Sequence, residues 1–366
     1  MKRKLAFFMT VSFLLCTIFP VCGCAGKKES EAMLFVKEMG NGINMGNSLD
    51  STGLREYNPL VQDLDFETFW GNPPLAKEQF HAVKTAGFST VRIPVTWQDH
   101  MDENGKVSPV WMERVDEVVR MALEEDLYVI LDTHHEDWLD LEVNQKEKTE
   151  EKFAFLWEQI AQQFADCGEK LLFEGINEPR KRDSEGEWKK GTKESREMLN
   201  GLNQIFVDTV RHSGGNNSSR YLLLDSYASN PIGGGFEDFV LPEDPRLIVS
   251  VHAYYPYDFC QNMSDQASLS WDRGSRSDTK EMKQSFVNAK RKFLDRGIPV
   301  ILTEFGCVDK SNKPERVEWT KYVMELSEKY GIPCLWWDEG KYYKILDRTS
   351  LTWEEEILKI LTGKNE

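Results

Sequence analysis

Eight short apolar runs recur along the chain, and longer polar stretches separate them. The runs lack the alternation of a half-exposed strand, which is typical of strands buried on both faces of a parallel sheet. They cover residues 42–47, 89–94, 127–135, 171–176, 221–225, 247–254, 299–305 and 334–338. We interpret these runs as eight parallel strands.

Amphipathic segments lie between the runs. Helical spacing of apolar residues is clear at 112–122 and 153–164, and it predicts further helices over 75–86, 195–212, 279–295 and 315–330. Several of these segments end at a glycine shortly before the next run, as expected where a helix ends in a left-handed residue. Eight strands with interleaved helices, and no internal linker, predict a single-domain α/β fold of the (β/α)8 TIM barrel type rather than a doubly wound sheet.

The first residues form a targeting pattern. Basic residues at 2–4 precede an apolar run over 5–19 and the sequence Val-Cys-Gly-Cys at 21–24. The pattern resembles a bacterial lipobox with Cys24 as the lipidated first mature residue. We predict a lipoprotein signal peptide over 1–23, a lipid-anchored tether over 24–35 and one folded domain over 36–366. This implies export and attachment to the membrane at the cell surface or envelope; ordinary secretion is the alternative.

The composition excludes some classes of binding partner. Acidic residues outnumber basic ones 61 to 45, and the net charge of -16 would repel nucleic acid but not a neutral polymer. Four of the seven cysteines lie beyond the leader and its Cys24, at positions 167, 260, 307 and 334, without Cys-x-x-Cys spacing. A cysteine zinc site is therefore not expected. Buried free thiols are the default, although export permits disulfides.

Polar side chains gather where the predicted strands end. In this barrel the C-terminal strand ends build the active site. The residues concerned are Asn44, Asn47, Arg92, His134, His135, Asn177, Glu178, His252, Tyr254, Glu304, Trp337 and Asp338. Two carboxylates from distant strands, Glu178 and Glu304, indicate a pair that acts on one substrate.

The ordered motifs carry a family resemblance. G-x-N-x-G-N, V-R-I-P, T-H-H, N-E-P, H-x-Y, T-E-F-G and W-W-D together resemble glycoside hydrolase family 5, the cellulase-type β-1,4-glucanases, from about residue 40 to 338. The segment E-T-F-W-G-N-P at 67–73 is similar to the endoglucanase and xyloglucanase branch. Ile43, where these enzymes often have Trp, and Glu339, where they have Asn, depart from the pattern and bear on the subsites.

The resemblance implies a catalytic domain that hydrolyses β-1,4-glucan with retention of configuration. Glu178 would be the general acid/base and Glu304 the nucleophile, about 5–5.5 Å apart. Arg92 and His252 are expected beside Glu304, which would keep it ionised. Glu178 is expected in a poorer environment, where it would stay protonated part of the time.

Further residues would bind the sugar chain. Asn177 would bond the sugar 2-hydroxyl and Tyr254 would orient Glu304. His134, His135 and Asn44 are expected to contact substrate, and Trp337 is the main aromatic platform. Other candidates for subsite walls are Trp70, Trp97, Trp138, Trp271 and Trp336, whereas Trp111 and Trp157 are expected in the core. Glu136 and Asp338 are expected to be loop charges. We predict no cofactor and a monomer.

Three alternatives stay open. The first is a β-mannanase of the same fold, and the second is a non-catalytic glycan-binding surface lipoprotein. The third is a metal-dependent barrel hydrolase with ligands from His134, His135, Glu136, His252 and Asp338. Adjacent histidines on a strand point to opposite faces, which argues against one ion between His134 and His135. The preferred polymer, whether cellulose, mixed-linkage glucan, xyloglucan or glucomannan, is not determined by these motifs.

Overall fold

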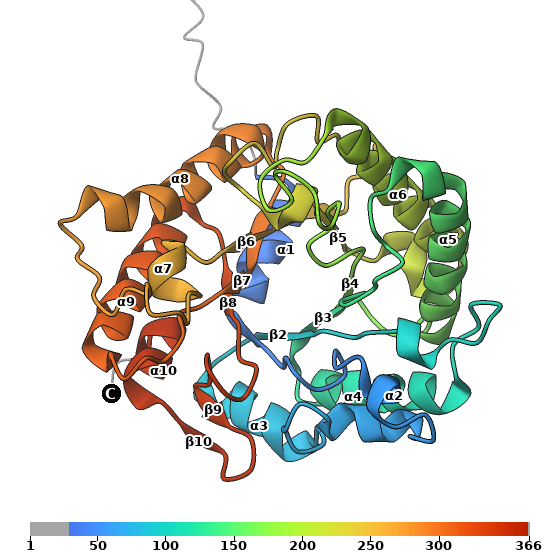
Figure 1. The fold of residues 1–366 in the computed structure, drawn as a ribbon, viewed down its shortest axis with the longest axis horizontal. Helices are drawn as coiled ribbons and strands as arrows, with labels where there is room; N and C mark the ends of the chain where they lie inside the picture. The colour runs from blue at the N-terminus through green and yellow to red at the C-terminus, as the bar shows by residue number, and fades with distance from the viewer. Residues whose placement is uncertain (1–28, 365–366) are drawn as a thin grey trace, which may run out of the picture.

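Eight parallel strands close into a barrel in the computed structural model, which describes residues 29–364 (Figure 1). The strands are β1 Gly42–Asn44, β2 Thr90–Ile93, β3 Tyr128–Asp132, β4 Leu171–Glu174, β5 Leu222–Asp225, β6 Leu247–Ala253, β7 Val300–Phe305 and β8 Cys334–Trp336. Each pairs with the next, and β8 pairs with β1. All eight predicted strands and the barrel are confirmed.

Long helices surround the barrel (Figure 1). They are α3 Lys77–Ala86, α4 Pro109–Glu124, α5 Lys146–Gln163, α6 Lys193–His212, α8 Arg276–Lys292 and α9 Lys313–Tyr330. Short helices are α2 Leu54–Tyr57 and α7 Tyr257–Cys260, with 3-10 turns at Asp63–Thr68, Gln98–His100, Val143–Gln145, Gly215–Ser219, Tyr227–Ser229 and Leu294–Arg296. Gly87 and Gly331 end α3 and α9 at φ values of 113° and 66°, as the sequence predicted. Within residues 29–364, none of the helices has the length and apolar character to cross a membrane.

Helix α1, Glu31–Met39, closes the end of the barrel at which the strands begin, here called the floor. Its buried Val36 and Met39 join the cluster of apolar side chains that fills the barrel interior. Phe35 stacks on Tyr221 with ring centroids 3.9 Å apart. The sequence placed residues 31–35 in the tether, whereas the structure places them in this helix, because their apolar face covers the barrel floor.

The inner face of the barrel changes from apolar to polar along the strands. Ile130, Leu172, Leu223 and Ile248 belong to the apolar cluster at the floor. Two residues further along each strand, the same face carries Asp132, Glu174, Asp225 and Ser250, all of them fully buried. This polar layer lies between the apolar floor and the strand ends, and it supports the groups at the mouth.

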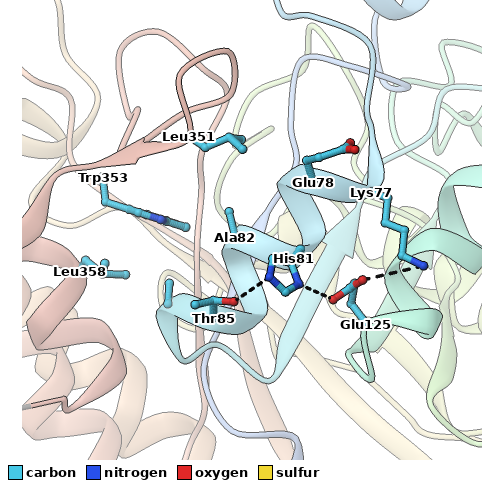
Figure 2. Close-up of a pocket in the computed structure, with 10 residues that line it drawn as sticks. Lys77, Glu78, His81, Ala82, Thr85, Glu125, Leu351, Trp353 and Leu358 are labelled. Atoms are coloured by element: carbon cyan, nitrogen blue, oxygen red, sulfur yellow. Dashed lines mark hydrogen bonds and ion pairs between the residues drawn. The ribbon is translucent and has the colours of Figure 1, made fainter.

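A C-terminal unit packs outside the barrel. It consists of β9 Leu346–Asp347, β10 Thr352–Trp353 and α10 Glu355–Thr362. Between this unit and α3 lies a hollow lined by Trp353, Ala82 and His81 (Figure 2). His81 bonds Glu125 at 2.9 Å within this hollow. Its lining contains none of the strand-end residues at which the chemistry was predicted, so we look for the active site at the barrel mouth.

Candidate active site

The two predicted catalytic carboxylates meet at the mouth of the barrel. Glu178 follows β4, and Glu304 lies on β7 opposite His252 of β6. One carboxylate oxygen of each glutamate and one ring nitrogen of His252 all lie within 4.8 Å of one another. Glu178 has a φ of 46°, a strained value for a residue with a side chain. Backbone strain of this kind is concentrated at functional sites.

Glu304 is held by two donors. The Arg92 guanidinium donates from Nη1 to Oε1 at 2.6 Å, and the Tyr254 hydroxyl donates to Oε2 at 2.9 Å. Both bonds favour the ionised carboxylate, because each needs an acceptor oxygen. The positions predicted for Arg92 and Tyr254 beside Glu304 therefore agree with the structure.

Arg92 is fully buried and fixes several residues at once. Its Nε donates to Glu174 Oε2 at 2.5 Å, and Nη2 lies 2.7 Å from Asp132 Oδ2. It also donates to Asn177 Oδ1 at 2.9 Å and to Asn44 Oδ1 at 3.1 Å. Burial would lower the pKa of Arg92, but the charges of its carboxylate partners raise it well above the usual value.

Asn44 and Asn177 differ in what they offer to a ligand. Asn44 is fully buried and its amide nitrogen donates to Thr303 O at 2.9 Å, so it positions Arg92 from below. Asn177 uses its oxygen for Arg92, and its exposed fraction is 9%. Its amide nitrogen is therefore the group left for substrate.

His252 lies between the two predicted catalytic carboxylates. Its Nδ1 is 3.1 Å from Glu178 Oε1 and 3.5 Å from Glu304 Oε2. Burial would lower the pKa of His252, but the charges of Glu304 and Glu178 raise it above its usual value. The imidazole thus favours its protonated form, with a carboxylate oxygen of each glutamate within 3.5 Å of Nδ1.

The proton affinities of the two glutamates are the reverse of those expected from the sequence. Burial opposes ionisation of Glu178, but the hydrogen bond and charge of His252 outweigh it and lower its pKa to about 2. Burial raises the pKa of Glu304, against the charges of His252 and Arg92. The reason is that His252 lies closer to Glu178, and that Arg92 shares its charge with Glu174 and Asp132.

His134 and Trp337 form one wall of the cleft. Their rings are parallel within 3°, with centroids 5.7 Å apart. Gly46 allows this arrangement, since a Cβ there would lie 2.7 Å from the Trp337 ring. His134 Nδ1 bonds Asp132 Oδ2 at 2.8 Å, which fixes the orientation of the imidazole.

The argument that His134 and His135 point to opposite faces is wrong. β3 ends at Asp132, so strand alternation no longer governs these two residues. Their ring centroids lie only 4.5 Å apart, and His135 is half-buried beside Trp70. Both histidines therefore lie on the same side of the cleft.

The aromatic candidates separate by burial. Trp97, Trp336 and Trp271 are buried core residues, as are Trp111 and Trp157. Trp138 is half-buried and Glu136 accepts its Nε1 proton at 2.6 Å. Of the proposed walls, Trp337 and Trp70 lie beside the cleft histidines.

The sequence reasoning did not single out Trp188, which is 51% exposed. The Arg180 guanidinium stacks on its ring at 3.8 Å, and the hollow beside Glu178 that it lines measures about 600 Å³. That volume is in the range of small-molecule sites. Trp188 lies in the segment between β4 and α6, and an aromatic residue in that polar segment was the signal available in the sequence.

The structure shows the surroundings of Ile43 and Glu339, the two residues that depart from the family pattern. Ile43 is buried in the core between barrel and helices, away from the cleft. Glu339 accepts the backbone N–H of Lys341 at 2.6 Å and so shapes the turn after β8. Asp338 accepts the N–H of Ile345 and of Leu346 at 2.7 and 2.9 Å, as expected for a loop charge.

Comparisons with known proteins agree with this geometry. The sequence profile of the family described as Cellulase (glycosyl hydrolase family 5) matches residues 55–342. Endoglucanase A of Ruminococcus albus is 41% identical over 338 residues, which are 89% of this chain and 90% of that protein.

Solved structures of endoglucanases are also similar to this chain. A GH5-4 broad-specificity endoglucanase from Ruminococcus champanellensis with bound cellotriose superposes with a TM-score of 0.86 at 36% identity, covering 92% of this chain and 99% of that one. A metagenomic xyloglucan-specific endo-β-1,4-glucanase in complex with cellotriose superposes with a TM-score of 0.85 at 34% identity, covering 91% and 98%.

Proposed function

The chain belongs to the cellulase family, glycoside hydrolase family 5, and from that premise we propose that it is an endo-acting retaining β-1,4-glucanase. Its substrates are plant cell-wall polysaccharides of the cellulose, β-glucan and xyloglucan type. The observation that carries the proposal is the pair Glu178 and Glu304, with carboxylate oxygens within 4.8 Å across one cleft. A separation of about 5–5.5 Å between carboxyl groups is that of enzymes which retain configuration.

Two displacements account for hydrolysis. Glu304 attacks the anomeric carbon while Glu178 gives a proton to the leaving oxygen, which forms a glycosyl-enzyme ester and releases one end of the chain. Glu178 then takes a proton from water, whose oxygen attacks the same carbon and frees Glu304. Both inversions together restore the starting configuration.

The proton for the first step comes from the hydrogen-bonded pair of His252 and Glu178. His252 holds this proton in the free site, 3.1 Å from the Glu178 carboxylate. Transfer along this bond gives neutral imidazole and a protonated Glu178 that can act as the acid. Asn177 donates from its amide nitrogen to the sugar 2-hydroxyl, and Trp337 supports a pyranose face.

Glutamine replacements test these roles. Glu304→Gln should lower kcat on soluble β-glucan by about 10³-fold or more, because the nucleophile is gone. Glu178→Gln should do the same on polysaccharide but keep much of the first step on an aryl cellobioside, whose leaving group needs no proton. Product configuration is read by NMR, and Glu142→Gln at the rim is the matched control.

Several results would contradict the proposal. Near wild-type turnover by Glu304→Gln would remove the nucleophile assignment, and inverted products would remove the double displacement. Binding of β-glucan without new reducing ends would indicate a glycan-binding protein, and cleavage of mannan alone would indicate a mannanase.

We also propose that the protein is exported and lipidated at Cys24. The leader pattern at residues 1–24 supports this, although the leader and Cys24 lie outside the described residues. Mass spectrometry of the mature N-terminus should find a diacylglyceryl modification on Cys24. An unmodified terminus beyond that residue would contradict the anchor.

A further inference from the structure

Asp50, His134 and His135 form a second cluster of ligand-type side chains at the mouth. Asp50 lies in the loop after β1, and the two histidines follow β3. One carboxylate oxygen of Asp50 and one ring nitrogen of each histidine lie within 4.8 Å of one another. Imidazole and carboxylate are the donors that first-row divalent metals take in proteins.

His134 is oriented as metal-binding histidines are. Its Nδ1 bonds Asp132 Oδ2 at 2.8 Å, and the same oxygen lies 2.7 Å from the Arg92 guanidinium. Asp132 is therefore the acceptor and Nδ1 carries the proton, so the lone pair of Nε2 is left for a ligand. A carboxylate behind a histidine is the usual outer partner of a metal-binding imidazole.

The other two proposed ligands, Asp50 and His135, differ in burial and in their hydrogen-bond partners. Asp50 is fully buried, and the backbone N–H groups of Asn47 and Ser48 donate to its two oxygens at 3.0 and 2.7 Å. Each of these oxygens keeps a further lone pair. His135 is half-buried and its ring contacts are with other rings. Zinc bonds of about 2.0–2.1 Å need donors closer together than 4.8 Å, so binding requires side-chain movement, and His135 is the least buried of the three ligands.

We propose that Asp50, His134 and His135 bind a divalent transition-metal ion such as Zn²⁺, and that the bound ion inhibits the enzyme. The inhibition rests on the proposed glucanase function, because His134 belongs to the same cleft wall as Trp337, the ring that would support a sugar. An ion held on His134 occupies that wall and competes with substrate. The bond-making and proton-transfer steps of the proposed hydrolysis use Glu178, Glu304 and His252, and none of the three proposed metal ligands.

Direct binding tests the site without any substrate. The full chain is treated with chelator, desalted and titrated with ZnSO₄ in a calorimeter. We expect one ion per chain, and His135→Gln should weaken binding by about tenfold or more. His81→Gln is the matched control, because His81 lies in the outer hollow on Glu125 (Figure 2) and should leave the affinity unchanged.

Thermal unfolding separates loss of the site from loss of the fold. Zn²⁺ should raise the unfolding temperature of the wild type and of His81→Gln but not of His135→Gln. Asp50→Asn provides a second variant with the same expectation. Unchanged zinc affinity in both folded variants would overturn the proposal and place the ion elsewhere, for instance on Glu178, His252 and Glu304, whose donors also lie within 4.8 Å.

Kinetics then test the inhibition. On soluble mixed-linkage β-glucan, Zn²⁺ should raise the apparent KM of the wild type with kcat unchanged, and each variant is compared with its own metal-free rate. Activation of the chelator-treated enzyme by Zn²⁺ would overturn the proposal and favour a metal-dependent hydrolase. If the chain binds Zn²⁺ through His135 but cleaves no glucan, the binding site stands and the proposed function fails.

Discussion

The charge of Arg92 is divided among three buried carboxylates. Glu174, Asp132 and Glu304 all lie within 2.7 Å of one of its nitrogens. Glu304 therefore receives only a share of the positive charge, and burial is free to raise its pKa. The polar layer below the cleft thus influences the proton affinity of Glu304, the proposed nucleophile.

Removal of Arg92 should destabilise the fold as well as the chemistry. Arg92→Met leaves buried carboxylates without their partner and should lower the free energy of unfolding by about 3–5 kcal/mol, with near-complete loss of activity. Urea unfolding measures the first effect. Arg273→Met is the control, since that exposed ion pair with Glu325 should change stability by less than about 1 kcal/mol. Equal stability of the two variants would contradict this account.

The shared proton of His252 and Glu178 should govern the alkaline limb of the pH–rate profile. In the wild type the pair keeps this proton until the pH passes the raised pKa of His252. His252→Asn leaves the proton on Glu178 alone, so activity should be lost at a lower pH than in the wild type. The profile of kcat/KM on an unactivated glucan measures the shift. If the alkaline limb does not move in His252→Asn, or moves equally in the exposed control His212→Asn, the proton is not shared between His252 and Glu178.

At the scale of elements, helix α1 completes the barrel floor without touching the cleft. Met39 is fully buried in the interior cluster, so Met39→Ala should lower the free energy of unfolding by about 2–5 kcal/mol. The kcat at low temperature should stay unchanged, because the cleft lies at the opposite strand ends. Lys37→Ala, on the exposed side of the same helix, should change stability by no more than about 0.5 kcal/mol. A drop in kcat for Met39→Ala in the folded enzyme would contradict the view that the barrel floor affects stability but not the cleft.

How far the sequence predicts this protein depends on the kind of signal. Buried parallel strands produce uniform apolar runs, and all eight were found. The same uniformity concealed Glu174 and Asp225, which occupy inward positions inside the runs. Helix α1 was missed because a polar stretch after the leader was interpreted as tether.

The details of the site depend on distances that no motif encodes. Strand-end motifs brought Glu178, Glu304, Arg92 and Tyr254 together as expected. Whether His252 lies nearer to Glu178 or to Glu304 is decided by differences of a few tenths of an ångström. The convergence of His134 and His135 depends on β3 ending at Asp132, and element boundaries are the least predictable feature of a sequence.

The whole molecule carries a net charge of -16, which bears on the choice of polymer. A neutral glucan is indifferent to this field, whereas carboxymethylcellulose is repelled by it. Raising NaCl from about 10 to 150 mM shortens the screening length from about 30 to 8 Å and should lower the KM for carboxymethylcellulose severalfold. The KM for neutral mixed-linkage glucan is the internal control and should not move. An equal salt response of the two polymers would exclude electrostatic repulsion as the cause.

The position of α1 at the barrel floor also fixes where the N-terminal segment joins the domain relative to the cleft. Ser30, directly before α1, donates its hydroxyl proton to the Gly297 carbonyl at 2.8 Å, at the end of the barrel where β7 begins. The chain therefore enters the domain on the side opposite the catalytic mouth. If the proposed lipid anchor at Cys24 is present, the attachment point lies on the side of the domain opposite the cleft, which leaves the cleft open to polysaccharide.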